Sequence, residues 1–266
     1  HMKDLGSREG IAKAKFEIIA GLNKDGLLVY DGDEPLLKPF ISNAPGLNTK
    51  SFGTGNKNDL CIEQVTFTEQ GSSFIVNGEL NEEMSIPILG EHQVKNTLAA
   101  LLVGKEIGLS SQQMRDALKQ IVLTDMRMQV IETNNGSIFI NDAYNAAPTS
   151  MRAAIQFLEK STIKPDKWLV LGDMLELGPD EKSFHEEIGE YISNDVFSGV
   201  CLFGSRMKWL KDQLSDKFDE QQLKWVENDY ESLISFLDSK ITNQSIVLVK
   251  GSRGMKLEKV IEPFQK

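Results

Sequence analysis

Residues 137–159 read SIFINDAYNAAPTSMRAAIQFLE, and they set the pattern for the second half of the chain. The apolar run Ser137-Ile138-Phe139-Ile140 predicts a buried strand, and Ser150 to Glu159 predicts a helix. Between them lies a polar turn that carries a carboxylate, a phenol and an amide. The stretch therefore predicts a strand that leads into a helix through a chemically rich turn.

The same alternation continues to the end of the chain. Further strands are expected at 168–171, 200–203, 223–226 and 246–249, and helices at 184–192, 207–214, 230–237 and 255–261. Strands that alternate with helices imply parallel pairing through crossovers. Uniformly apolar strands fit a sheet covered on both faces. We therefore expect residues 125–266 to form a doubly wound, Rossmann-like α/β domain.

The first half of the chain has a different order of elements. It predicts a helix at 7–22, strands at 27–30, 64–67, 73–76 and 84–88, and helices at 94–107 and 111–121. We interpret the acidic residues around Asp33 as a simple turn and Gly53 to Lys57 as an ordinary loop. A linker near Thr124-Asp125-Met126 is expected to act as a hinge between the halves.

Composition excludes two classes of partner. Asp and Glu number 39 against 29 Lys and Arg, giving a formal net charge of −10. Broad binding to nucleic acid or to an anionic membrane requires a basic surface, so we expect neither. No apolar stretch approaches the roughly 20 residues that span a bilayer. Cys61 and Cys201 are far apart, and Cys201 lies in an apolar run, which predicts a buried thiol and a reducing compartment.

Polar loops follow four of the strands in the second half. They comprise residues 142–148, 172–178, 204–206 and 250–254. Ligands of doubly wound folds meet the loops at the carboxyl ends of strands. We expect Asp142 to accept hydrogen bonds from a ribose, with Tyr144 and Asn145 beside the ligand. The alternative for this turn is a plain helix cap.

The last of these loops, Lys250-Gly251-Ser252-Arg253-Gly254, predicts an anion site. It offers backbone donors, the cations Lys250 and Arg253, the hydroxyl of Ser252 and the start of a helix. That combination suits a carboxylate or a phosphate. It is not a Walker motif, whose spacing G-x-x-x-x-G-K-[ST] occurs nowhere in the chain.

The segment Gly90 to Ala100 opens a helix with two amides on one face. Gln93 and Asn96 are three residues apart and so face the same way. An amide offers a donor and an acceptor together, which pair with an adenine edge. A core or capping asparagine is the alternative for this segment alone.

Several long motifs resemble one protein family. Gly90 to Ala100 resembles the segment G-x-H-N-x-x-N-x-L-A-A of Mur ligases. The strings DAYNAAPTSM (142–151), LGDMLELG (171–178) and VKGSRGM (249–255) are similar to the family branch that adds D-alanyl-D-alanine. Residues 6–15 resemble the family's segment beyond its phosphate loop, so the likeness covers nearly the whole chain in the family's order.

The resemblance implies a fold and an activity. It implies a partial Mur-ligase central ATP-binding domain at residues 1–124, followed by the Rossmann-like ligase domain at 125–266. The family's uridine-nucleotide domain and phosphate loop are not in this sequence, so we expect a fragment that is inactive alone. The implied enzyme is a cytoplasmic, monomeric ATP- and Mg²⁺-dependent ligase of peptidoglycan synthesis. It joins D-alanyl-D-alanine to UDP-N-acetylmuramoyl-tripeptide through an acyl phosphate.

The resemblance also implies roles for single residues. Lys15 matches a lysine that becomes carbamylated and helps to hold Mg²⁺, and His1 matches a histidine close to that metal. Asn96 matches an asparagine that contacts adenine, while Gln93 stands where the family often has asparagine. Arg127 matches an arginine that reaches the ATP phosphates when the domains close, and Asp142 matches the ribose-binding acid.

Three alternatives remain open. The chain could be another Mur-type or folylpolyglutamate-type amino-acid ligase, although the strings at 142–151 and 171–178 disfavour this. It could be a binding module without catalysis, because the phosphate loop is absent. It could be a structural α/β protein, against which the four polar strand-end loops argue.

Overall fold

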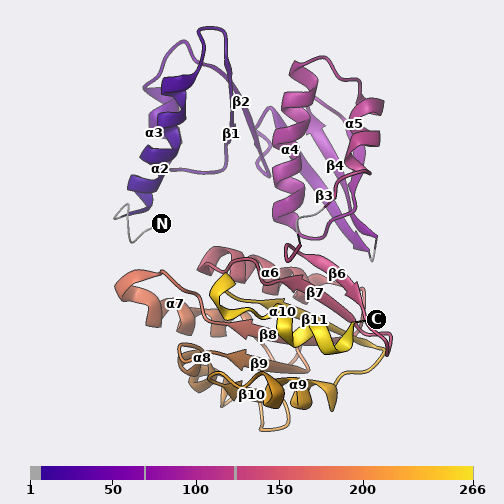
Figure 1. Cartoon of the computed structure of the whole chain (residues 1–266). Helices are drawn as coiled ribbons and strands as arrows, with labels where there is room; N and C mark the ends of the chain where they lie inside the picture. Colours follow the sequence, from indigo (N-terminus) through magenta and orange to yellow (C-terminus); the bar gives the residue numbers. More distant parts are fainter. Residues whose placement is uncertain (1–6, 69, 123–124, 266) are drawn as a thin grey trace. The chain divides into compact units, whose positions relative to one another are not determined.

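The computed structural model describes residues 7–68, 70–122 and 125–265. The chain divides into two compact units, residues 1–122 and residues 123–266 (Figure 1). Each unit has a sheet of its own. Across the described residues, no helix has the length and apolarity that crossing a membrane would require.

The first unit is built on a mixed sheet with five strands in chain order. The strands are β1 (Leu27–Asp31), β2 (Asn48–Gly53), β3 (Leu60–Thr68), β4 (Gly71–Gly78) and β5 (Glu82–Ile86). β1, β2 and β3 run parallel, whereas β3, β4 and β5 form an antiparallel meander. Because β1 and β2 are parallel and in register, both end at the same edge of the sheet.

Helices accompany this sheet, and the longest covers it. They are α2 (Arg8–Phe16), continued by the 3₁₀ helix η1 (Glu17–Gly21), then α3 (Lys38–Ser42), α4 (Glu91–Glu106) and α5 (Ser111–Leu118). Fully buried Val94, Leu98 and Leu101 recur at helical spacing along α4, which contacts β1, β2 and β3. Ser110 caps α5, as its hydroxyl accepts the N–H of Gln113.

The second unit is doubly wound, as predicted. Its strands are β6 (Gln129–Glu132), β7 (Ile138–Asp142), β8 (Asp166–Gly172), β9 (Gly199–Phe203), β10 (Leu223–Val226) and β11 (Ser245–Lys250). Their order is β10-β9-β8-β11-β7-β6, and every pair except β6 with β7 is parallel. Crossover connections therefore bring the ends of β7, β8, β9 and β11 to one edge.

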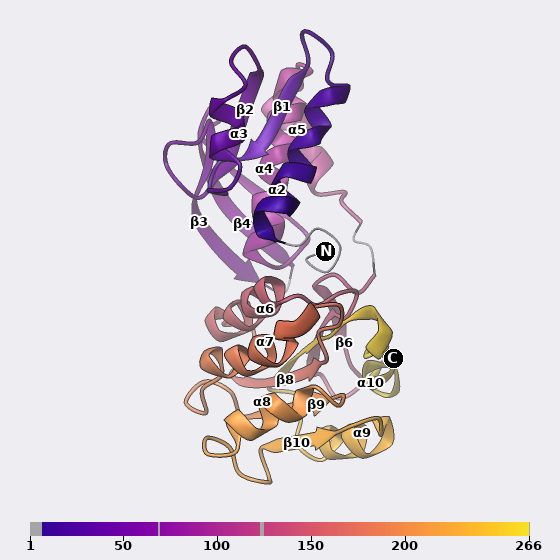
Figure 2. The same ribbon diagram turned by 90° about the vertical axis from the view of Figure 1, so that its left-hand side faces the viewer.

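Helices cover both faces of this second sheet (Figures 1 and 2). They are α6 (Pro148–Lys160), α7 (Glu181–Glu187), α8 (Met207–Leu214), α9 (Tyr230–Asp238) and α10 (Glu258–Ile261), with short 3₁₀ helices η2 (Gly178–Asp180), η3 (Ile188–Tyr191), η4 (Arg253–Met255) and η5 (Glu262–Phe264). Alternate strand residues face the two layers, so all five positions of β9 are buried. Burial raises the pKa of the Cys201 thiol to about 12, which agrees with the predicted buried cysteine.

Two strands, β2 and β6, and one α-helix, α3, were not predicted. The strand β2 has the sequence NTKSFG, whose polar residues do not alternate cleanly with apolar ones. It is held by tertiary hydrogen bonds instead, because the Asp59 carboxylate accepts both the N–H and the hydroxyl of Ser51 at 2.7 and 2.8 Å. A one-dimensional pattern does not reveal such support.

The prediction of one final helix over residues 255–261 was wrong. The segment breaks into η4 and α10 at Lys256, whose φ of 46° lies in the left-handed region. The Tyr230 hydroxyl donates to the Met255 carbonyl at 2.6 Å, and so takes an acceptor that a continuous helix would use internally. A contact from α9 therefore ends the turn.

Candidate functional site

A buried ion pair lies where β7 and β11 end side by side. The register pairs Asp142 with Lys250, and Lys250 Nζ lies 2.5 Å from Asp142 Oδ2. The same ammonium donates to the Asn145 carbonyl at 3.0 Å, and Asp142 Oδ1 accepts the N–H of Met128 at 3.1 Å. Only 3% of the Lys250 side chain and 10% of the Asp142 side chain are exposed. Charges buried to this degree require such partners.

This pairing bears on two of the predicted site residues. Asp142 was predicted to bind a ribose, and both of its oxygens already accept a protein donor. Each carboxylate oxygen has a second lone pair, so a ribose hydroxyl can still be accommodated. Lys250 was predicted to bind an anion, yet its ammonium lies beneath the surface and neutralises Asp142.

Arg127 is displayed on a strained loop. Its neighbours Met126 and Met128 both have positive φ, 63° and 53°, which is unfavourable for residues other than glycine. The loop is held because Gln129 Oε1 accepts the N–H of Met126 and the Met126 carbonyl accepts the N–H of Tyr144. The exposed Arg127 guanidinium carbon lies 4.1 Å from the centre of the Tyr144 ring. The structure thus brings Arg127, Tyr144 and, through Met128, Asp142 together.

Ser252 connects two of the strand-end loops. Its hydroxyl accepts the N–H of Leu175 at 2.9 Å, and its own N–H donates to the Asp173 carbonyl at 3.1 Å. Ser252 is buried, with 5% of the residue exposed. It was predicted to bind substrate, and in the structure its hydrogen bonds connect the loop after β8 to the loop after β11.

The two remaining predicted residues on this edge are at the surface. Arg253 is exposed and forms an ion pair with Glu258 at 2.6 Å. Asn145 is exposed too, and its Oδ1 accepts the N–H of Ala146 at 2.8 Å. Both are accessible to a ligand, unlike Lys250 and Ser252.

The loop after β8 is anchored by groups that the sequence did not single out. Buried His185 accepts the N–H of Met174 at its Nε2, 3.0 Å away, and therefore donates from Nδ1 to the Glu181 carbonyl at 2.6 Å. Burial lowers the pKa of His185, which favours this neutral form. Asp173 Oδ1 accepts the N–H of Met207, and burial raises the pKa of this carboxyl. These bonds fix residues 172–178 at the sheet edge.

In the first unit, the predicted adenine contacts lie on the first turns of α4. Asn96 is exposed and Gln93 is half-buried. The helix begins after Gly90, whose φ of 106° and proximity to the His92 ring, 2.8 Å from a hypothetical Cβ, favour glycine there. The amide side chains are therefore presented at the end of α4 that follows this tight turn.

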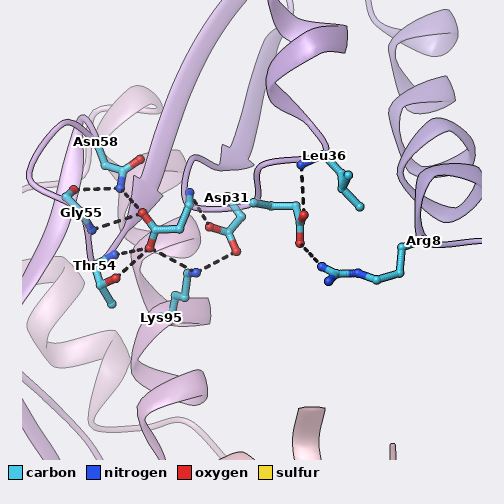
Figure 3. A network of polar contacts seen from close by, with 9 residues as sticks. Arg8, Asp31, Leu36, Thr54, Gly55, Asn58 and Lys95 are labelled. Carbon is cyan, nitrogen blue, oxygen red and sulfur yellow. Dashed lines mark hydrogen bonds and ion pairs between the residues drawn. The ribbon is translucent and has the colours of Figure 1, made fainter. Parts of the chain in front are cut away.

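An unpredicted polar network lies at the end of β1 (Figure 3). The Asp33 carboxylate accepts hydrogen bonds from Thr54 N (2.6 Å), Thr54 Oγ1 (2.9 Å), Gly55 N (3.2 Å) and Asn58 Nδ2 (2.9 Å). A Cβ at Gly53 would lie 2.4 Å from Asp33 Oδ2. Burial opposes the charge of Asp33, but these hydrogen bonds outweigh it and hold the pKa of Asp33 well below its usual range. The residues around Asp33, predicted to be a simple turn, and Gly53 to Lys57, predicted to be an ordinary loop, thus form one hydrogen-bonded structure.

Lys95 joins this network from α4. Its Nζ lies 2.8 Å from Asp31 Oδ2 and 3.4 Å from Asp33 Oδ2. Burial disfavours the ammonium, but the ion pairs with Asp31 and Asp33 raise the pKa of Lys95 above its usual value. Lys95 therefore stays charged, directly beside Asn96 in the chain.

Of the two predicted metal ligands, Lys15 and His1, only Lys15 lies within the described residues. Lys15 is exposed on α2 and lines a pocket of about 200 Å³ together with Arg8, Glu34 and apolar side chains. Glu34 already pairs with Arg8 at 3.4 Å. Among residues 7–68, 70–122 and 125–265, no three His, Cys, Asp or Glu side chains cluster in a way that could hold a metal ion. His1 lies outside the described residues, so its metal role stays a prediction.

The sequence carried a weak signal for the missed network. Aspartates at positions 31 and 33 follow a strand, and Thr54 stands between two glycines after another segment. A loop with glycines on both sides of a hydroxyl residue can present several donors to one carboxylate. The partners are 21 to 25 residues apart, and the parallel pairing of the unpredicted β2 with β1 brings them together.

Comparison of the sequence with known protein families finds a match in each of the two units. Residues 1–104 match the family described as the Mur ligase middle domain, and residues 126–253 match the Mur ligase glutamate ligase domain. A UDP-N-acetylmuramoyl-tripeptide–D-alanyl-D-alanine ligase of Bacillus subtilis is 42% identical over 262 residues. That alignment covers 98% of this chain and 56% of the relative.

Solved structures give the same result. MurF ligase from Thermotoga maritima, in complex with ADP, has a TM-score of 0.84 at 26% identity and covers 98% of this chain and 58% of its own. MurF from Acinetobacter baumannii also has a TM-score of 0.84 at 26% identity, covering 99% and 56%. The chain thus spans a little over half the length of the relatives that it matches. Together, the two matched domains and the shared fold show that this chain belongs to the Mur ligase family.

Proposed function

We propose that this chain serves an ATP-dependent ligase that adds D-alanyl-D-alanine to UDP-N-acetylmuramoyl-tripeptide during cytoplasmic peptidoglycan precursor synthesis. The observation that carries the proposal is the Arg127 loop. Two residues with a left-handed backbone conformation flank Arg127, whose exposed guanidinium lies over the Tyr144 ring, and the loop is bonded to Asp142 through Met128. Backbone strain of this kind is typical of functional sites. The relatives' names supply the choice of substrates.

The proposed reaction has two steps. The tripeptide carboxylate first attacks the γ-phosphorus of ATP, which gives an acyl phosphate and ADP. The amine of D-alanyl-D-alanine then attacks the acyl carbon and loses a proton, and phosphate leaves as the amide forms. A carboxylate and a γ-phosphate repel each other, so the first step requires a cation that approaches both. We assign this role to Arg127, which is exposed and has no carboxylate partner among the contacts that hold its loop.

Each unit carries residues that we assign to nucleotide binding. Asn96, with Gln93 beside it, would pair with the adenine edge through side-chain amides. Asp142 would accept a ribose hydroxyl with its remaining lone pairs, while its Oδ2 pairs with the Lys250 ammonium. The ADP bound by the Thermotoga relative supports a nucleotide site in this family.

The acceptor side would use exposed residues at the same sheet edge. Tyr144, Asn145 and Arg253 are exposed and can contact a dipeptide or the acyl phosphate. Buried Lys250 and Ser252 would act indirectly, since they hold the loops on which these residues stand.

Mg²⁺ would neutralise the ATP phosphates when bound. A carbamate on Lys15 would turn a cation into an oxygen ligand of the kind that Mg²⁺ prefers. The other carboxylate of its pocket, Glu34, already pairs with Arg8, so these side chains alone do not fit a metal. We therefore assign no step to the metal.

An acceptor screen on the complete gene product tests the proposal. ADP release would be measured with ATP, UDP-N-acetylmuramoyl-tripeptide and a panel of amines: D-alanyl-D-alanine, single amino acids and glutamate. The proposal predicts turnover with the D-alanyl-D-alanine dipeptide at least tenfold above that with any other amine. A second assay would replace the tripeptide with a folate, and a preference for glutamate in that assay would instead identify a folylpolyglutamate-type ligase. The absence of turnover with every amine would leave a binding protein and overturn the proposal.

A further inference from the structure

One short acidic segment connects three elements of the first unit. We call residues Asp31 to Glu34 the acidic turn. Asp31 and Asp33 contact Lys95 on α4, Asp33 binds the loop that follows β2, and Glu34 pairs with Arg8 on α2 (Figure 3). The turn itself is ordered from within, because Asp31 Oδ1 accepts the N–H of Asp33 and Glu34 Oε1 accepts the N–H of Leu36.

The strongest part of this connection is the cage around Asp33. Four donors from Thr54, Gly55 and Asn58 converge on one carboxylate, and Lys95 approaches as a fifth. Hydrogen bonds to an ionised acceptor are roughly twice as strong as neutral ones. Side chains at positions 53 and 55 would collide with the carboxylate or press against it, at 2.4 and 3.0 Å. The acidic turn therefore has one defined position relative to the loop.

Lys95 links the acidic turn to α4, so the position of the turn also fixes that of the helix. It lies on the first turns of the helix, and its ammonium is held by two carboxylates from the end of β1. The next residue, Asn96, is exposed, and Gln93 lies one turn earlier on the same region of the helix. A rotation of α4 about its axis would carry both amides away from their present direction, and it would also break the contact of Lys95 with Asp31.

Stability alone does not account for this arrangement. Partly exposed ion pairs typically contribute about 0 to 1 kcal/mol. The side chains of Lys95, Asp31 and Asp33 are between 25% and 35% exposed, so the ion pairs of Lys95 contribute little to folding. A residue that aligns a binding group within a fraction of an ångström can still change affinity strongly.

We propose that Lys95 and Asp33 are positioning residues, through which the acidic turn holds the first turns of α4 so that Asn96 and Gln93 face the base of a bound purine nucleotide. This inference rests on the proposed function, because it needs a nucleotide on α4. It assigns to Lys95 no direct contact with the triphosphate. Its specific consequence is that Lys95 governs the choice of base and not the affinity for phosphate.

The test measures the binding and use of ATP and GTP by the complete gene product. Lys95→Met removes the ammonium but keeps the length of the side chain. We expect the KM for ATP to rise about 5- to 10-fold with kcat nearly unchanged, since the lost interaction is made equally in ground and transition states. The KM for GTP should change less than twofold, so the preference for ATP over GTP should fall. Lys95→Arg should restore most of the ATP preference.

A matched control is available on the same helix. Lys105 is also a lysine of α4 and pairs with Glu79 at 2.9 Å, but it lies at the opposite end of the helix. Lys105→Met should leave both KM values within twofold of the unmodified protein. Hydrogen–deuterium exchange without nucleotide should show faster exchange at residues 54–58 and 91–97 in Lys95→Met, and no such change in Lys105→Met.

Each outcome decides between defined possibilities. Equal weakening of ATP and GTP would mean that Lys95 contacts the phosphates directly, and would overturn the positioning role. Unchanged KM values together with unchanged exchange would overturn it too. If the unmodified protein neither binds nor uses ATP, the proposed function fails, and this inference fails with it. Loss of the ATP preference in Lys95→Met alone, with rescue by arginine, supports the inference.

Discussion

Two lysine–aspartate contacts, one in each unit, lie at the carboxyl ends of parallel strands but in different surroundings. Lys250 and Asp142 are almost completely buried, whereas Lys95 is one quarter exposed and shares its charge between Asp31 and Asp33. The first pair joins two neighbouring strands, and the second joins a strand end to a helix. Water screens the second contact and not the first, so the two should differ in what they do for the molecule.

The comparison teaches how burial divides the roles of similar contacts. Breaking a buried pair leaves a charge without solvent, so its main effect is on folding. Breaking a partly exposed pair leaves two charges that water can solvate, so its main effect is on where the side chains point. The following variants separate these effects, beginning with the largest.

Lys250→Met should produce the largest loss of stability, about 3–5 kcal/mol, because Asp142 would remain buried without its counter-ion. All three tryptophans, Trp168, Trp209 and Trp225, lie in the second unit, so urea unfolding followed by tryptophan fluorescence reports on that unit. Lys211→Met is the matched control, since Lys211 forms an exposed pair with Asp212. A loss below 1 kcal/mol for Lys250→Met would mean that the pair is not buried in solution.

Asp33→Asn should lower the free energy of unfolding by a smaller amount, about 1–2 kcal/mol. One carboxylate oxygen is replaced by an NH₂ donor that faces other donors. Urea unfolding followed by circular dichroism would measure it, with Glu63→Gln at the exposed Asn77 contact as a control.

The effect of Asp33→Asn should also depend on pH. The folded-state pKa of Asp33 lies below its unfolded value of about 3.9, so its contribution is complete above that pH and is lost as pH falls toward the folded pKa. The difference between the two proteins should therefore stay constant from about pH 8 to 5 and shrink below about pH 4. A difference that grows on acidification would contradict the assigned hydrogen bonds.

Lys95→Met should have the smallest effect on folding, below about 1 kcal/mol, although it changes nucleotide preference. Its effect should shrink further between 0.05 and 0.5 M salt, because exposed charges are screened. The effect of Lys250→Met should barely change with salt over the same range. Equal salt sensitivity of the two variants, measured as shifts in the urea midpoint, would remove the distinction between the contacts.

The sequence predicted the second sheet better than the first, and the reason is physical. Strands buried on both faces, such as β8, β9 and β11, contain an uninterrupted run of apolar residues and can be recognised without their neighbours. The strand β2 is half-polar and depends on Asp59 and on pairing with β1, so no local pattern marks it. The break at Lys256 likewise depends on a contact from Tyr230 in another helix.

The site residues divide in the same way. Residue types in loops at strand ends indicated Asp142, Lys250 and Ser252, but not that Lys250 would neutralise Asp142 across 108 residues of sequence. The cage around Asp33 was missed because its donors come from a strand that was not predicted. Motifs thus indicate which residues belong to the site. Whether such a residue can contact a ligand or only holds a loop in place depends on strand register and burial.

The most direct test of the account is Arg127→Ala in the complete gene product. The variant removes the exposed guanidinium and keeps the pair beneath it, since Met128 N still bonds to Asp142. We predict that the rate of ligation of D-alanyl-D-alanine, measured as amide product formed per enzyme per unit time under saturating substrates, falls by about 100-fold or more. Tryptophan-monitored stability should change by less than about 1 kcal/mol, as for most exposed substitutions. Ligation at the unmodified rate would contradict the role of Arg127 and the function proposed from it.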